Sequence, residues 1–225
     1  ESLYKEVLKT QPNHFESIFY LGALSIQTKN FDKAKQLLEK AIKIQPNFVA
    51  AHNNLGIVFK ELGEHKKAMS HFQKAIEIQP NFENAYYNLG VAFKGLNEFK
   101  KAINCFKKAI QINPNYVMAY NNLGLVFQEL NENEKAINCY EKVIQVDPNY
   151  VNAYNELGKI LGELDRVNEA KKYFEKSLNL DPNRERTCEY YGNILLKLNQ
   201  HSKALTFLRK GTGFIRFTQK DFKII

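Results

Sequence analysis

The chain is poor in the residues that build covalent frameworks and metal centres. Its 225 residues include three cysteines, two methionines and no tryptophan. An odd cysteine count without a CxxC pair argues against a disulfide framework or a zinc site, and favours a reducing compartment. No apolar run approaches the roughly eighteen residues needed to cross a bilayer, and the first residues lack a signal-peptide pattern. We therefore expect a cytoplasmic protein that does not enter a membrane.

Sequence motifs of catalysis are also missing. The five histidines include no pair spaced three or four residues apart, and there is no GxGxxG, Walker loop, GxSxG or HExxH. Cys105 and Cys139 share one position of a repeating pattern, which favours packed thiols over a redox couple. We expect no cofactor, no metal and no catalytic residue, and therefore no enzymatic activity.

Prolines are few but strictly periodic. All six, at positions 12, 46, 80, 114, 148 and 182, are separated by 34 residues, and six glycines and six alanines follow the same period. Three residue types that share one period indicate a single supersecondary unit stacked on copies of itself.

Each unit is predicted to contain two helices. In residues 83–116, apolar positions with helical spacing mark a first helix, Asn97 and Glu98 mark a turn, and Pro114 ends a second helix. Glycine within a helix costs roughly 0.5–1 kcal/mol relative to alanine, so its recurrence predicts a close approach to the first-helix backbone. The aromatic residues expected beside that crossing are Phe72, Phe106, Tyr140 and Phe174.

This pattern of aromatic residue, Leu-Gly, aromatic residue, Ala, aromatic residue, Ala and Pro resembles the tetratricopeptide repeat (TPR). The resemblance implies an all-α fold, a right-handed superhelical solenoid of stacked antiparallel helix pairs. We assign repeats to residues 15–48, 49–82, 83–116, 117–150 and 151–184, and a degenerate capping repeat to 185–210. Residues 1–14 are expected to be the second helix of a truncated preceding repeat, in a chain cut from a longer one.

Residues 211–225 lie outside the repeat pattern. The last second helix is expected to stop near Lys210, with Gly211 as its C-terminal cap. Beyond it, apolar residues alternate at Ile215 and Phe217 and again at Phe222 and Ile224, which predicts two strands with a turn at 219–221. The segment is interpreted as a strap over the end of the stack or as the start of a following domain.

If the units stack, the side of each first helix that faces away from its partner should line a concave groove. Asparagine is a poor residue for a helix interior, so its recurrence in the first helices needs a reason. Its carboxamide matches the main-chain amide of an extended peptide. The candidate peptide-binding residues are Asn53, Asn54, Ile57, Lys60, Asn84, Tyr87, Asn88, Val91, Lys94, Asn121, Asn122, Leu125, Gln128, Asn155 and Lys159.

The asparagine row is similar to that of the TPR region of O-linked N-acetylglucosamine transferase, whose repeats present asparagine to peptide backbones. That resemblance implies binding of a peptide. The alternative is that these asparagines bond to one another or to water across neighbouring units. Glu61, Glu129 and Glu163, at the ends of first helices, are interpreted as solvated helix surface.

The formal net charge of +8 raises nucleic acid as a partner. However, the excess lysines fall on second helices, without the interleaved aromatic residues that stacking on bases requires. We therefore expect a protein or peptide partner, and no nucleic acid.

Three functions remain open. The first is a protein–protein interaction scaffold that binds an extended peptide. The second is the substrate-recognition arm of a larger enzyme, such as a glycosyltransferase, sulfotransferase or oxygenase. The third is a structural subunit that self-associates through its N-terminal end or its C-terminal tail.

Overall fold

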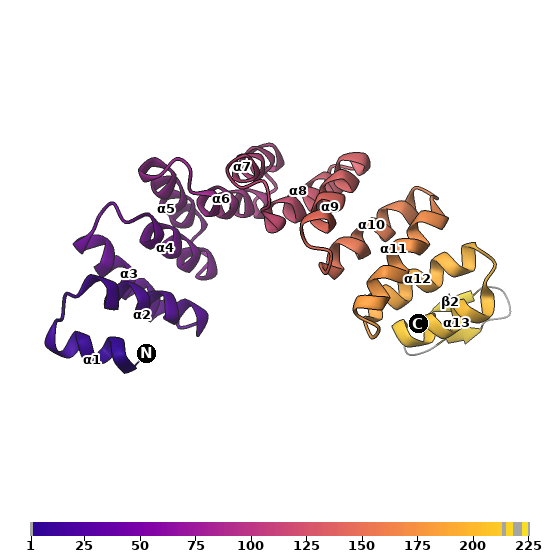
Figure 1. Cartoon of the computed structure of the whole chain (residues 1–225), viewed down its shortest axis with the longest axis horizontal. Helices are drawn as coiled ribbons and strands as arrows, with labels where there is room; N and C mark the ends of the chain where they lie inside the picture. The colour runs from indigo at the N-terminus through magenta and orange to yellow at the C-terminus, as the bar shows by residue number, and fades with distance from the viewer. Residues whose placement is uncertain (1, 213–214, 218–221, 225) are drawn as a thin grey trace. The chain divides into compact units, whose positions relative to one another are not determined.

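The computed structural model describes residues 2–212, 215–217 and 222–224, which form thirteen helices and two short strands (Figure 1). The chain divides into two compact units, unit 1 (residues 1–119) and unit 2 (residues 120–225), with the border inside helix α8 (Val117–Glu129). None of the described helices is both long and apolar enough to cross a membrane.

Unit 1 is a stack of antiparallel helix pairs that follow one another in chain order (Figure 1). Its first helices pack against the second helix of the same repeat and also against the next repeat. The helices are α1 (Ser2–Thr10), α2 (Phe15–Gln27), α3 (Phe31–Ile44), α4 (Val49–Glu61), α5 (His65–Ile78), α6 (Glu83–Gly95) and α7 (Phe99–Ile112).

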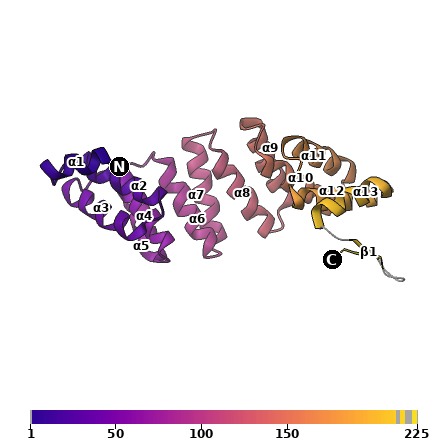
Figure 2. The same cartoon turned by 90° about the horizontal axis from the view of Figure 1, so that it is seen from below.

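Unit 2 is built from helix pairs of the same kind, which follow one another in chain order (Figure 2), and two short strands come after them. Its helices after α8 are α9 (Asn133–Val146), α10 (Val151–Glu163), α11 (Val167–Leu180), α12 (Glu185–Lys197) and α13 (His201–Thr212). Strands β1 (Ile215–Phe217) and β2 (Phe222–Ile224) are antiparallel, with Ile215 opposite Ile224. The strands fall where the sequence alternates, while the predicted turn at 219–221 lies outside the described residues. The predicted all-α class with antiparallel helix pairs is confirmed.

A second-helix side chain lies directly on the recurrent first-helix glycine. A Cβ atom added at Gly56 would lie 2.5 Å from Cε1 of Phe72, and one added at Gly90 would lie 2.7 Å from Cε1 of Phe106. Both rings are fully buried. The predicted close approach at glycine is therefore confirmed, and the approaching group is a side-chain ring rather than the second-helix backbone.

The turn inside each repeat uses a left-handed residue at one fixed position. Positive φ angles occur at Lys29, Gly63, Asn97, Asn131, Asp165 and Asn199, again 34 residues apart. Gly, Asn and Asp tolerate this conformation best, which explains five of the six residues. The prolines lie two residues beyond the second helices, as Pro114 does beyond Ile112.

An ion pair recurs where the second helix begins. Lys101 pairs with Glu98 and lies 5.2 Å from the ring centroid of Phe93, and Lys67 and Lys135 make the equivalent contacts in their repeats. In the repeat of α10 and α11 the two charges are exchanged, because Arg166 and Glu169 replace the Glu and the Lys.

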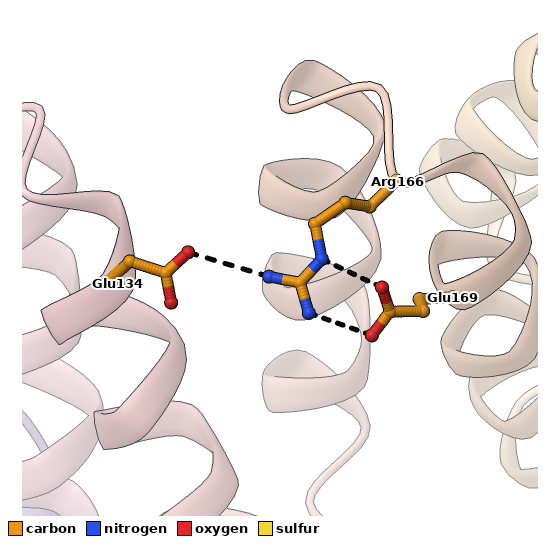
Figure 3. A network of polar contacts seen from close by, with 3 residues as sticks. All are labelled: Glu134, Arg166 and Glu169. Carbon is orange, nitrogen blue, oxygen red and sulfur yellow. Dashed lines mark hydrogen bonds and ion pairs between the residues drawn. The ribbon is translucent and has the colours of Figure 1, made fainter.

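Arg166 also joins two repeats. Its Nε and Nη2 atoms each donate to the Glu169 carboxylate at 2.8 Å, and its Nη1 atom lies 3.5 Å from Oε1 of Glu134 on α9 (Figure 3). The hydrogen bonds to Arg166 lower the pKa of Glu169, and the same bonds raise the pKa of Arg166. The pair of Arg166 and Glu169 therefore keeps the ion pair at the start of the second helix, and Arg166 adds a second ion pair to the preceding repeat.

The last helix ends close to the predicted Lys210, but the predicted cap at Gly211 is wrong. Helix α13 continues to Thr212, so Gly211 lies in its final turn and is not a cap. A Cβ atom at Gly211 would lie 2.6 Å from the Glu189 backbone nitrogen and 2.8 Å from the Glu185 carbonyl oxygen. Glycine is needed there because the backbone of α12 passes directly against α13.

The glycines of helix α6 allow a direct test of this packing. Gly90→Ala should destabilise the protein by about 1–2 kcal/mol, since overpacking against Phe106 outweighs the better helix propensity of alanine. Gly95→Ala on the same helix should be neutral or stabilising by up to about 1 kcal/mol, because beyond the adjacent backbone of its own helix no atom lies within 4 Å of the added Cβ. Urea unfolding of both variants measures the difference, and equal effects would contradict the packing argument.

Candidate functional site

In unit 1 the predicted groove residues lie on α4 and α6, and part of their hydrogen bonding is already used within the protein. Asn53 is only 6% exposed, and its Oδ1 accepts from Nδ2 of Asn88 at 2.9 Å. The two asparagines belong to neighbouring repeats, so this bond crosses the repeat boundary. The remaining predicted residues, Asn54, Ile57, Lys60, Asn84, Tyr87, Asn88, Val91 and Lys94, are half-buried.

Asn84 and Tyr87 contact the chain that leaves the second helix of their own repeat. The Tyr116 hydroxyl donates to Oδ1 of Asn84 at 2.7 Å, and the Tyr116 ring lies 5.2 Å from that of Tyr87. Burial raises the pKa of Tyr116 to about 12, so the hydroxyl keeps its proton and remains a donor. Tyr116 therefore fixes the orientation of the Asn84 carboxamide, which keeps its amide nitrogen and the second lone pair of its oxygen for a ligand.

In unit 2, Asn155 joins three helices. Its side chain is 8% exposed, and its Oδ1 accepts from Oγ of Ser177 and Oγ1 of Thr187, both at 2.7 Å. Both hydroxyl residues are fully buried, Ser177 on α11 and Thr187 on α12. The structure thus places Asn155 in the packing between helices, while Asn121, Leu125, Gln128 and Lys159 are half-buried and Asn122 is 8% exposed.

Two adjoining recesses open on the first helices α8, α10 and α12 of unit 2. They share Lys159 and Glu163, and we call them together the unit 2 groove. The first, the acidic recess, has a volume of about 410 Å³ and is lined by Leu125, Gln128, Glu129, Asn131, Asn133, Glu156, Lys159 and Glu163. The second, the apolar recess, has a volume of about 320 Å³ and is lined by Gly158, Lys159, Gly162, Glu163, Phe174, Tyr190, Asn193, Ile194 and Lys197.

A chain of hydrogen bonds orients the floor of the acidic recess. The buried Tyr140 hydroxyl donates to Oε1 of Gln128 at 2.5 Å, and Nε2 of Gln128 donates to Oε2 of Glu156 at 3.2 Å. Burial, and then the Glu156 carboxylate, raise the pKa of Tyr140, so this hydroxyl stays a donor. Gln128 and Glu156 are therefore held in place before any ligand arrives.

Three of the sequence-predicted residues, Leu125, Gln128 and Lys159, line the unit 2 groove. Glu129 and Glu163 line it as well, although the sequence pattern favours solvated helix surface for them. The sequence did offer one signal for their place in the groove: both lie at the end of a first helix, and that position borders the next repeat.

A histidine pair in unit 1, made of the buried His52 and the half-buried His71, is invisible in the sequence. His52 on α4 and His71 on α5 are 19 residues apart, yet their Nδ1 atoms lie 3.2 Å apart. Nε2 of His52 is 2.9 Å from the Pro46 carbonyl oxygen, and the His71 ring lies 5.3 Å from that of Phe59. Burial, and then the neighbouring His52, lower the pKa of His71 to about 4.

The described residues provide little else for chemistry. They contain no group of three or more His, Cys, Asp or Glu arranged to hold a metal ion. None of the three cysteines forms a disulfide, and all three lie among the described residues. Burial raises the pKa of Cys105 to about 11, so this thiol stays protonated near neutral pH. Stacked helix pairs with grooved first-helix faces define a repeat protein of the solenoid class.

Family models identify the repeat. Tetratricopeptide repeat models match residues 49–82 and 83–116, 151–184, and 105–138, and a further TPR repeat model matches 25–63 and 127–165. The chain belongs to the tetratricopeptide repeat family. A search of the curated protein sequences finds no match to the chain.

Solved structures agree with this fold. A crystal structure of MamA is 32% identical, covers 72% of this chain and 94% of its own, and has a TM-score of 0.65. The pilF protein of Pseudomonas aeruginosa is 21% identical over 86% of this chain and 88% of its own, with a TM-score of 0.79. YrrB, described as a TPR protein with an unusual peptide-binding site, is 17% identical over 82% and 95%, with a TM-score of 0.63.

The histidine pair predicts an acid-sensitive unit 1. Between pH 6.5 and about 4 the unfolded chain binds a proton at His71 that the folded chain does not. The free energy of unfolding is therefore unaffected by His71 above pH 6.5 and decreases as the pH falls from 6.5 to about 4. The variant His52→Tyr with His71→Cys copies the residues at 86 and 105, one repeat later. Its melting temperature should fall less between pH 7 and 4.5 than that of the unmodified protein.

The exposed His65 provides the control for this experiment. His65→Gln should leave the pH dependence of the melting temperature unchanged. An equal loss of stability in all three proteins would contradict the role of the pair.

The hydrogen bonds of Asn155 are expected to stabilise unit 2. Asn155→Ala leaves two buried hydroxyls without their acceptor, at a cost of roughly 1–3 kcal/mol for each one that finds no other partner. The triple variant Asn155→Leu, Ser177→Ala and Thr187→Val should recover most of that stability, because it removes donors and acceptor together. Urea unfolding measures both, with Asn193→Ala, at an exposed position, as the control. If Asn155→Ala costs no more than the control, the carboxamide does not hold these helices together.

Proposed function

We propose that the chain is a non-catalytic scaffold for protein–protein interactions, and that the unit 2 groove holds an extended peptide segment of a partner. One observation carries the proposal. Two recesses adjoin on the first-helix face and share Lys159 and Glu163, and neither side chain forms an ion pair or hydrogen bond with another described residue. A continuous path with unpaired charges and an apolar end suits a chain of amino acids better than a compact small molecule.

Polar groups along this path match a peptide main chain. Gln128 on α8 is held in position by Tyr140, and Asn193 is exposed on α12. A single neutral hydrogen bond contributes roughly 0.5–1.5 kcal/mol, whereas ordering a flexible segment costs about 2–5 kcal/mol or more. Binding therefore needs several amide contacts together with apolar contacts such as those of Leu125 and Ile194.

In unit 1 the proposal extends to the half-buried residues of the asparagine row. Asn54 and Asn88 offer carboxamides, and Ile57 and Val91 offer aliphatic surface beside them. The bond between Asn88 and Asn53 leaves the Asn88 oxygen to accept from a peptide N–H group. The likeness to YrrB supports the fold that such binding requires.

A role as a scaffold requires no reacting group from this chain. The protonated thiol of Cys105 fits that role, since a thiol is a poor nucleophile. The exposed lysines of the second helices, such as Lys107 and Lys108, are assigned to solubility rather than to nucleic-acid binding.

Selection from a random peptide library with the whole 225-residue protein tests the proposal. Peptides that are selected should lose about tenfold or more in affinity for the groove variant Leu125→Glu with Lys159→Ala, measured by fluorescence anisotropy. The matched control Lys107→Ala with Lys108→Ala, on an exposed second-helix surface, should bind within about twofold of the unmodified protein. If no peptide is selected, or if both variants bind equally well, the groove is not the binding site.

A further inference from the structure

Resting on the proposed function, we infer that the unit 2 groove selects a peptide segment in which a large apolar side chain lies close in sequence to a basic one. The apolar side chain occupies the apolar recess, and the lysine or arginine occupies the acidic recess. Both preferences come from a single first-helix position that carries a different residue in unit 2 than in unit 1.

Gly162 is the residue that opens the apolar recess. In the three preceding repeats this position carries Lys60, Lys94 and Gln128, which all have long side chains. At Gly162 there is no side chain, and Ile194 approaches so closely that an added Cβ would lie 2.9 Å from its Cδ1 atom. Ile194, itself only 5% exposed, packs against this gap, and Gly162 and Ile194 together form part of the lining of the apolar recess.

The apolar recess has the size and lining of a pocket for one side chain. Gly158 lies one helical turn before Gly162, and the nearly fully buried ring of Phe174 lies against it, forming the floor. Its volume of about 320 Å³ has room for one large side chain. It suits a leucine, isoleucine or phenylalanine side chain.

The loss of lysine at this same position makes the adjoining recess acidic. In unit 1, Lys60 pairs with its neighbour Glu61 at 3.0 Å. In unit 2 the corresponding carboxylates, Glu129 and Glu163, follow Gln128 and Gly162, so neither comes directly after a lysine in the sequence. Among the described residues, neither carboxylate forms an ion pair.

The acidic recess thus contains three carboxylates, Glu129, Glu156 and Glu163, and one ammonium group, Lys159. Lys197, at the rim of the apolar recess, does not offset them, because its Nζ atom is 3.1 Å from Oδ1 of Asp165 and 3.1 Å from the Gly162 carbonyl oxygen. The formal net charge of +8 does not set the local preference, since physiological salt screens charges beyond about 8 Å. A cationic side chain is therefore favoured in this recess.

Designed peptides test the pairing with the whole protein. The probe is a fluorescein-labelled Gly-Ser dodecapeptide that carries one leucine and, two and three residues further along, two arginines. Two comparison peptides replace the leucine by serine or both arginines by glutamate. Fluorescence anisotropy should show the probe binding at least about tenfold more tightly than either comparison peptide, with an affinity that weakens as salt is raised.

Protein variants assign the two preferences to the two recesses. Gly162→Gln restores the residue found at 128 and should remove the preference for leucine over serine. Glu129→Gln with Glu163→Gln should remove the preference for arginine over glutamate and leave the leucine preference intact. These two glutamates are exposed, so the second variant tests the inference even if Gly162→Gln folds poorly.

The outcomes separate this inference from the proposed function. If library peptides bind the groove but lack an apolar and basic pair, or if the glutamate peptide binds as well as the probe, the inference is overturned and the peptide-binding function stands. Failure of all three designed peptides to bind also overturns it. If no library peptide depends on the groove, the proposed function fails as well.

Discussion

The structure depends on one contact that recurs in every repeat, in which a side chain of the second helix lies on a glycine of the first. In four repeats the side chain is an aromatic ring, such as Phe72 on Gly56 and Phe174 on Gly158, and in the terminal repeats it is Leu38 or Leu208. The contact sets how close the two helices of a pair can come. Because each pair has the same geometry, its outer apolar surface matches that of the next pair, and the stack can continue.

Function in such an array arises at positions that the stacking does not use. The position of Lys60 lies on the first-helix face, so it can change without disturbing the contact between glycine and ring. Where lysine is replaced by Gln128 and Gly162 the helices stay in place, both residues line a recess, and Glu129 and Glu163 form no ion pair among the described residues. In contrast, Asn155 lies on the packed side, where its carboxamide bonds to Ser177 and Thr187, and there a polar residue stabilises the array.

Periodicity made most of the fold predictable. The 34-residue spacing of proline and glycine indicated the helix pairs, the turns and the close approach at Gly90, because each of these is a local property of one repeat. The alternation near Ile215 and Phe222 indicated the two strands for the same reason. The end of α13 was not predictable, since Gly211 serves a contact with the α12 backbone and not a cap.

The sequence by itself determined the fold class and the face of the first helices on which the candidate groove lies, since helical periodicity assigns every residue to a face. Only the tertiary structure decided how residues distant in sequence meet. It paired His52 with His71 across 19 residues, used Asn155 in helix packing, and joined the surroundings of Lys159 and Glu163 into one groove. The physical reason is that periodicity specifies direction from a helix axis, whereas hydrogen bonds and recesses depend on distances between helices.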